Sequence, residues 1–335
     1  MLGVMALAIL ASIGAEAPPG RFVVDVRPVP LNATDPAQTR VGPLAYRGGL
    51  WLRSPDPRFG GLSGLQVSAD GRQVVAVSDC GRGFTARLEY DPAGNLAGVS
   101  DSTLTELLGP GGRALEREEI DAEGLAPAAD RGVLVVFERS LPRIWSYRQL
   151  PPLTGPPAAQ PGPPFDDECG GNHGPEALAN LADGRLFVAC EGSGLEGEAT
   201  VAWLGRGESW SSRPYLLEPR ETGFGDVFRP TGATLLPDGD VLVLERRFPP
   251  IEARIMRLSR AELEGDGPLV PREVARLAPP LTLDNFEGID VRRDASGATL
   301  LYLVSDDNGC GKRPNVVAPR ALQRTLLVMF ELLPG

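Results

Sequence analysis

The chain repeats one pattern: a short apolar stretch, a polar turn that often contains Asp-Gly, a second apolar stretch and then an acidic residue. Asp-Gly between two such stretches is a strong signal for a β-hairpin. The second stretch has the length and composition of a buried strand. The pattern predicts five hairpins, whose second strands are expected at 74–78, 133–137, 185–189, 241–245 and 300–304.

The hairpins recur about every 50 to 60 residues, and further strand-like stretches lie between them, such as 143–147 and 253–258. A repeat of this length with four strands is typical of a β-propeller blade. The long amphipathic helices of a parallel α/β fold do not occur in the sequence. We expect an all-β propeller in which the stretches 21–28 and 45–52 pair with 324–332 to complete a sixth blade. Five blades is the alternative.

The N-terminus carries the pattern of a signal peptide over residues 1–17. An apolar run over 2–15 ends in Ala15-Glu16-Ala17, an A-x-A cleavage pattern, and is too short to span a bilayer as a helix. We therefore expect a periplasmic or secreted protein without a membrane span after cleavage. The Pro-rich stretch 151–164 falls inside one repeat and is expected to be a loop, so 18–335 should form a single domain.

Composition excludes several classes of function. The formal net charge of −11 disfavours nucleic acid and anionic membranes as partners. His173 is the single histidine, so a two-histidine metal site cannot form, and any Ser-His-Asp triad would have to use it. We expect a monomer that acts on a small molecule.

The chain has four cysteines and no C-x-x-C pair, which makes zinc binding or redox catalysis an unfavoured interpretation. An even number of cysteines in an exported protein suggests two disulfides. Three pairings are possible, and the repeat favours Cys80–Cys310 and Cys169–Cys190. Four buried free thiols is the alternative.

Acidic residues are expected to gather at one end of the propeller. In an antiparallel hairpin, the residue that begins the first strand lies at the same rim as the residue that ends the second. Corresponding rims of all blades meet at the mouth of the central channel. The carboxylates expected there are Asp79, Glu123, Glu138, Glu176, Glu191, Glu245, Glu287 and Asp306, with Asp226 just upstream of the fourth hairpin and Asp307 nearby.

So many like charges require compensation. Neighbouring arginines could pair with them, or a hard cation could bind, because carboxylate and amide oxygens without His or Cys favour calcium or magnesium. The alternative is that each acid accepts hydrogen bonds from backbone amides of the next blade and only holds the blades together.

Several stretches resemble the phytase-like family, which is described by an esterase-like activity of phytase. The most specific are LPDGDVLVLERRF at 236–248, DNFEGI at 284–289 and SDDN at 305–308, and the resemblance extends over about residues 43 to 332. It implies a secreted or periplasmic propeller that depends on Ca²⁺ and hydrolyses phosphoesters or esters. Cys80 and His173 depart from the expected pattern.

Under this hydrolase hypothesis the acids and nearby polar residues take separate roles. The metal ligands would be Asp79, Glu123, Glu138, Glu191, Glu245, Asp306 and Asp307; the catalytic residues Glu176, Glu287, Arg246 and Arg247; and the substrate-binding residues Arg139, Lys312 and Asn285. Two alternatives remain: a non-enzymatic ligand- or protein-binding propeller with structural calcium, and a lactonase-like hydrolase that uses the same carboxylates on a neutral ester.

Overall fold

The structure is a computed structural model. It describes residues 22–128, 132–139, 142–148, 153–165, 169, 173–192, 199–217, 227–248, 251–309 and 323–334. The predicted signal peptide and the predicted residues Lys312, Cys310 and Asp226 lie outside these ranges. No helix within them is both long and apolar enough to traverse a lipid bilayer.

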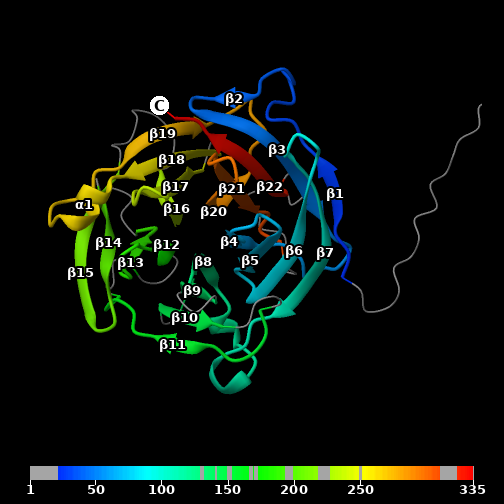
Figure 1. Cartoon of the computed structure of the whole chain (residues 1–335). Helices are drawn as coiled ribbons and strands as arrows, with labels where there is room; N and C mark the ends of the chain where they lie inside the picture. Colours follow the sequence, from blue (N-terminus) through cyan, green and yellow to red (C-terminus); the bar gives the residue numbers. More distant parts are fainter. Residues whose placement is uncertain are drawn as a thin grey trace, which may run out of the picture.

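The strands of the described residues form five antiparallel sheets, which surround a central axis like the blades of a propeller (Figure 1). Blade 1 contains β4 (Leu62–Val67), β5 (Gln73–Ser78), β6 (Arg82–Tyr90) and β7 (Leu96–Glu106). Blade 2 contains β8 (Ala122–Pro127), β9 (Val133–Phe137), β10 (Arg143–Tyr147) and β11 (Ala158–Gln160). Blade 3 contains β12 (Pro175–Asn180), β13 (Leu186–Cys190), β14 (Ala199–Arg206) and β15 (Ser209–Leu216).

Blade 4 contains β16 (Arg229–Leu235), β17 (Val241–Arg247), β18 (Glu252–Leu258) and β19 (Arg272–Leu277). Blade 5 contains β20 (Asn285–Arg293), β21 (Thr299–Asp306), β22 (Thr325–Leu332) and β3 (Leu44–Arg53), with β1 (Asp25–Pro28) and β2 (Arg40–Val41) at its edge. A short helix, α1 (Arg260–Glu264), lies between β18 and β19, and two 3₁₀ turns, Pro110–Gly112 and Arg117–Glu119, lie between β7 and β8. The prediction of an all-β propeller is confirmed.

The prediction of a sixth blade is wrong, because the described chain forms the five blades of the alternative. Strand β22 pairs antiparallel with both β21 and β3. The chain ends do pair, as the sequence suggested, but the fifth hairpin β20–β21 supplies only two strands of its own blade. The C-terminal and N-terminal strands therefore become its third and fourth strands and close the ring.

The hydrophobic core is divided among the interfaces between blades. Five apolar clusters of described residues each combine side chains from two neighbouring blades. Because every second strand is almost wholly apolar, as in the fully buried β9 and β13, both faces of each blade can be covered by its neighbours. This arrangement leaves the ends of the inner strands as the places where polar side chains can gather.

Each inner strand has a β-bulge close to its first residue. The register of pairing with the second strand shifts at the same place in β4, β8, β12, β16 and β20. A bulge leaves one residue out of the ladder and redirects its side chain. We call these residues the bulge positions; they are Ser63, Glu123, Glu176, Thr231 and Glu287.

Glycine follows the bulge position in four of the five inner strands. A Cβ atom at Gly124 would overlap the carbonyl oxygen of Glu176, and one at Gly232 would overlap that of Glu287. The inner strands therefore approach each other backbone to backbone at the bulges, which brings the five bulge positions into one ring. Ala177 occupies the equivalent place in blade 3.

One of the predicted disulfides, Cys169–Cys190, is confirmed. Cys80 is also disulfide-bonded, while its predicted partner Cys310 lies outside the described residues. Cys190 is the last residue of β13, so this bond ties the segment before β12 to the end of the second strand of the same blade.

Asp290 in β20 fastens blade 5 to both of its neighbours. Its Oδ2 accepts a hydrogen bond from the Val67 amide (2.7 Å) and its Oδ1 accepts one from the Thr234 hydroxyl (3.0 Å). Burial raises the pKa of Asp290 from 3.8 to about 7, although both hydrogen bonds act to lower it. Because the folded-state pKa is the higher one, this group stabilises the fold below about pH 4, and the contribution is lost as the pH rises to about 7.

We expect Asp290→Asn to be more stable than the wild type at pH 8, by an amount on the order of 3 kcal/mol, and to lose this advantage near pH 4. Asparagine keeps both hydrogen bonds, since its oxygen can accept from Val67 and its amide can donate to Thr234. Urea unfolding of both proteins at the two pH values measures the difference. An equal difference at both pH values would show that ionisation of Asp290 does not contribute.

Candidate functional site

The mouth of the propeller is the end of the axis where the inner strands begin and the second strands finish. The residue that closes each second strand lies beside the residue two places before the bulge position. In blades 1 to 3 this contact is a backbone hydrogen bond, from Glu138 to Asp121 (2.9 Å) and from Glu191 to Gly174 (2.8 Å), for example. In blades 4 and 5 it is strand pairing, of Arg246 with Arg229 and of Asp306 with Asn285. The five closing residues are Asp79, Glu138, Glu191, Arg246 and Asp306.

Glu245 is not one of them, and its assignment as a mouth carboxylate needs correction. In β17 it pairs with Pro230, one residue short of the closing position that Arg246 occupies. A shift of one residue turns a side chain to the opposite face of a strand. Glu245 is fully buried within the blade interface, where its carboxylate accepts hydrogen bonds from Arg254 and from the Tyr215 hydroxyl (2.6 Å).

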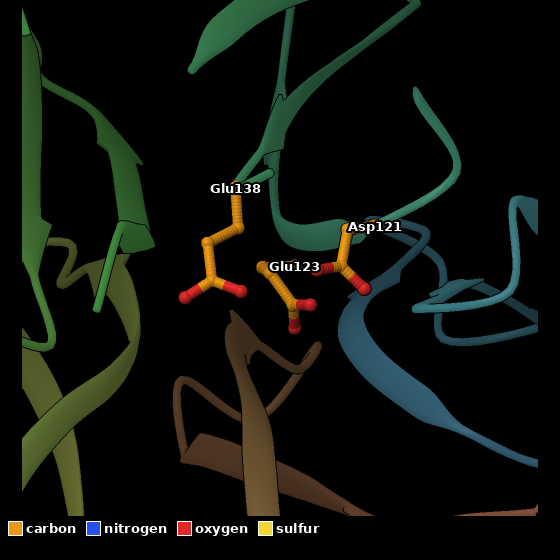
Figure 2. Close-up of side chains that lie close together, drawn as sticks. All are labelled: Asp121, Glu123 and Glu138. Atoms are coloured by element: carbon orange, nitrogen blue, oxygen red, sulfur yellow. The ribbon is translucent and has the colours of Figure 1, made fainter. Parts of the chain in front are cut away.

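Carboxylates from blades 2 and 3 lie close enough to share a cation. Oxygens of Asp121, Glu123 and Glu138 lie within 4.8 Å of one another, and so do oxygens of Glu138, Glu176 and Glu191. Figure 2 shows the first three side by side, with Asp121 projecting from the segment that leads into β8. Glu138 belongs to both groups, and its Oε1 accepts a hydrogen bond from the Gly174 amide (2.9 Å), so it also joins the two blades.

Asp121 was not among the residues predicted from the sequence. The signal that could have found it is its place two residues before Glu123, which Asn285 repeats two residues before Glu287. Asp121 is 5% exposed and forms an ion pair with Arg139 (2.7 Å between Oδ2 and Nε). Arg139 therefore lies at the mouth as predicted, but it already faces a carboxylate.

Glu123 and Glu176 stand out because they are buried and accept no hydrogen bond within the described structure. They are 8% and 6% exposed, and within the described ranges neither forms a hydrogen bond or an ion pair with another residue. Burial raises the pKa of both well above the usual value, and the neighbouring carboxylates raise it further, although Arg246 acts to lower the pKa of Glu176. A buried carboxylate without a donor is costly unless it is protonated or binds a cation.

Blade 5 contributes a second acidic region. Asn285 donates a hydrogen bond to Glu287 (2.7 Å), and burial raises the pKa of Glu287 to about 7, although Arg246 acts to lower it. Burial also raises the pKa of Asp306 well above its usual value, with Glu287 and Asp79 adding to the effect. These three acids therefore influence one another across blades 5 and 1.

Asp307, predicted as a ligand, braces the backbone instead with one of its oxygens. Its Oδ1 accepts hydrogen bonds from the amides of Gly61 and Gly309, each at 2.9 Å. Gly61 lies directly before β4, so this contact connects the segment after β21 of blade 5 to the start of blade 1. It is the bracing role that the sequence left open as an alternative for every acid.

The two arginines predicted to be catalytic lie in different surroundings. The Nη2 atom of Arg246 lies 3.3 Å from Glu287 and 3.6 Å from Glu191, in the centre of the acidic mouth. Arg247 faces the other way: its Nη2 pairs with Glu252 (3.0 Å), and its guanidinium lies 4.7 Å from the centre of the Phe228 ring. Arg247 therefore does not reach the mouth, for the same reason of strand alternation that excludes Glu245.

The donor set of the mouth fits a hard divalent cation. All of its candidate ligands are carboxylate oxygens with an amide oxygen nearby. The single histidine, His173, is half-exposed and lies 3.8 Å from Glu191. Oxygen-only sites suit calcium or magnesium rather than zinc or copper. The clustered carboxylates could thus bind a metal ion.

Comparison with known proteins identifies one family. The family model "Phytase-like: Esterase-like activity of phytase" matches residues 57–309. No curated protein matches the chain. An endo-arabinase from Bacteroides thetaiotaomicron is 12% identical and covers 83% of this chain and 95% of its own, with a TM-score of 0.47.

Two further solved structures are similar at a comparable level. A gluconolactonase from Xanthomonas campestris is 14% identical over 95% of this chain and 99% of its own, with a TM-score of 0.39. The PQQ-bound form of an aldose sugar dehydrogenase from Streptomyces coelicolor is 17% identical over 94% and 99%, with a TM-score of 0.34. At these identities and scores the likenesses carry no argument about activity.

Proposed function

The chain belongs to the phytase-like family, and on that premise we propose that it is an exported, calcium-dependent hydrolase of phosphoesters or esters. The observation that carries the proposal is the pair Glu123 and Glu176, two glutamates more than nine-tenths buried that have no hydrogen bond or ion pair among the described residues. Buried acids of this kind reduce the stability of the fold unless they bind a ligand. The disulfide Cys169–Cys190 supports a periplasmic or secreted location.

The residues that would hold calcium are the carboxylates of the two groups that share Glu138, with the acids of blades 1 and 5 opposite them. These are Asp121, Glu123, Glu138, Glu176 and Glu191, then Asp79 and Asp306. Bound calcium would offset the negative charge of the mouth and polarise the ester.

The remaining chemistry is assigned to the protein's own groups. Arg246 would hold a negatively charged oxygen of the substrate through its guanidinium. Glu287, with a pKa of about 7 and held by Asn285, is suited to accept a proton from the attacking water. The water oxygen bonds to phosphorus, the bond from phosphorus to the alcohol oxygen breaks, and the departing alkoxide takes a proton from solvent.

Removing calcium is expected to abolish turnover and lower thermal stability. The purified protein is chelated, and hydrolysis of p-nitrophenyl phosphate, p-nitrophenyl acetate, phytate and a lactone is followed before and after calcium is restored. At a calcium concentration of about 100 times its Kd, the stability should rise by roughly 2.7 kcal/mol.

The outcomes separate the alternatives. Calcium-dependent turnover of the acetate or the lactone alone would identify a hydrolase of neutral esters. A calcium-induced rise in Tm without cleavage of any substrate would identify a non-enzymatic, calcium-binding propeller. If calcium changes neither Tm nor turnover, the metal site is refuted.

A further inference from the structure

Blade 4 differs from the other blades at the mouth. Each of the other four carries at least one carboxylate at its bulge or closing position, whereas blade 4 carries Thr231 and Arg246 there. The third residue of this rim, Arg229, is buried and donates to the backbone carbonyls of Glu191 and Gly192. The mouth is therefore acidic over the other blades and cationic at blade 4.

Arg246 still has donors to offer. Its contacts with Glu287 and Glu191 are both made by Nη2, and its side chain is 22% exposed. A guanidinium carries five N–H donors. Of the other cations described at the mouth, Arg139 is paired with Asp121 and Arg229 donates to backbone carbonyls. This rim can hold one small anionic group but not the several charges of a polyphosphorylated ligand.

An exposed aromatic side chain lies close to Arg246 in the sequence. Phe248 comes after the last residue of β17, two places beyond Arg246, and is 41% exposed. Within the described residues one other large apolar side chain is exposed to this degree, Val270 at 48%, beside Leu269, which pairs with the outer strand β15. Aromatic surface next to a polar anchor gains free energy when an apolar group covers it.

We infer that Phe248 and Arg246 together select the substrate: Arg246 holds its single anionic group, and Phe248 packs against an adjoining aromatic or apolar group. This inference rests on the proposed function and makes it narrower. It identifies the substrate as a monoester of an aryl or other apolar alcohol rather than a polyphosphorylated polyol such as phytate. Phe248 is a specificity residue and takes no part in bond cleavage.

Binding of non-hydrolysable probes tests the inference without depending on turnover. The Kd values of phenylphosphonate, methylphosphonate and phytate are measured by calorimetry in the presence of calcium, for the wild type, Phe248→Ala and Val270→Ala. We expect the wild type to bind phenylphosphonate about five- to tenfold more tightly than methylphosphonate. Phe248→Ala should reduce this ratio to about one and leave the Kd of methylphosphonate unchanged, while Val270→Ala should change neither.

The inference is overturned if Phe248→Ala leaves the ratio intact, if phytate binds more tightly than phenylphosphonate, or if neither phosphonate binds. Turnover of p-nitrophenyl phosphate is followed separately on the same proteins. Selective binding of phenylphosphonate without turnover would refute the hydrolase function and support the role of Phe248. Turnover with a binding ratio that Phe248→Ala does not alter would support the hydrolase function and refute the role of Phe248.

Discussion

Glu176→Gln is expected to make the calcium-free protein more stable than the wild type at pH 8. Glu176 is 6% exposed, lies within 4.8 Å of oxygens of Glu138 and Glu191, and has no donor among the described residues. Glutamine has the same shape without the charge, so the substitution removes both the repulsion and the loss of hydration. A gain of about 1–3 kcal/mol follows, which corresponds to a rise in Tm of roughly 2–8 °C.

The same substitution should remove the response to calcium. In the wild type calcium is expected to raise Tm and permit hydrolysis, whereas in Glu176→Gln the calcium-induced rise should be nearly lost and turnover should fall at least about a hundredfold. Glu208→Gln, at an exposed turn between β14 and β15, is the matched control and should behave as the wild type. A full calcium response in Glu176→Gln would exclude this glutamate from the metal site. A lower Tm without calcium would mean that the carboxylate braces the fold.

Together these expectations describe an exchange of stability for function. The second strands follow the packing rules closely, because β9 and β13 are buried and apolar throughout. The bulge positions break the rules, since Glu123 and Glu176 are charged residues placed among buried backbone. Local inconsistency of this kind is expected at functional sites, where stabilising substitutions tend to reduce activity.

Much of the fold followed from local patterns. Each predicted hairpin joins residues about 15 positions apart, so turn chemistry and alternation suffice to bring Glu123 and Glu138, or Glu176 and Glu191, to the same rim. The number of blades depends instead on where β22 and β3 pair, a contact between the two ends of the chain. No pattern within a single repeat contains that information.

The errors at Glu245 and Arg247 have one physical origin, the register of strands around a bulge. The fourth repeat ends its apolar stretch in Glu245, as the others end in an acid, yet pairing of Arg229 with Arg246 places the arginine at the mouth. Bulges add one residue to one strand, and sequence alternation alone does not reveal which residue is added. Thr231 was overlooked because a neutral residue stands where three of the other four blades have Glu.

The largest loss of stability is expected for Glu245→Gln, at the glutamate that lies in the blade interface and not at the mouth. Glu245 and Arg254 are both fully buried and pair with each other, and Tyr215 donates the other hydrogen bond to the carboxylate. Glu245→Gln removes the carboxylate that pairs with the buried guanidinium of Arg254. Breaking a buried pair from one side costs about 3–5 kcal/mol, so Tm should fall by roughly 10 °C while the Kd for calcium stays unchanged.

Glu191→Gln is the matched comparison, since it makes the same chemical change one blade away, in a residue that lies at the mouth. It should weaken calcium binding without lowering the Tm of the calcium-free protein, the opposite of Glu245→Gln. If Glu245→Gln does not fold, the double variant Glu245→Leu with Arg254→Met restores a neutral interface and is expected to fold and to bind calcium normally. If the folded double variant no longer binds calcium, Glu245 must be a calcium ligand, because the two apolar substitutions lie at the blade interface and change nothing else at the mouth.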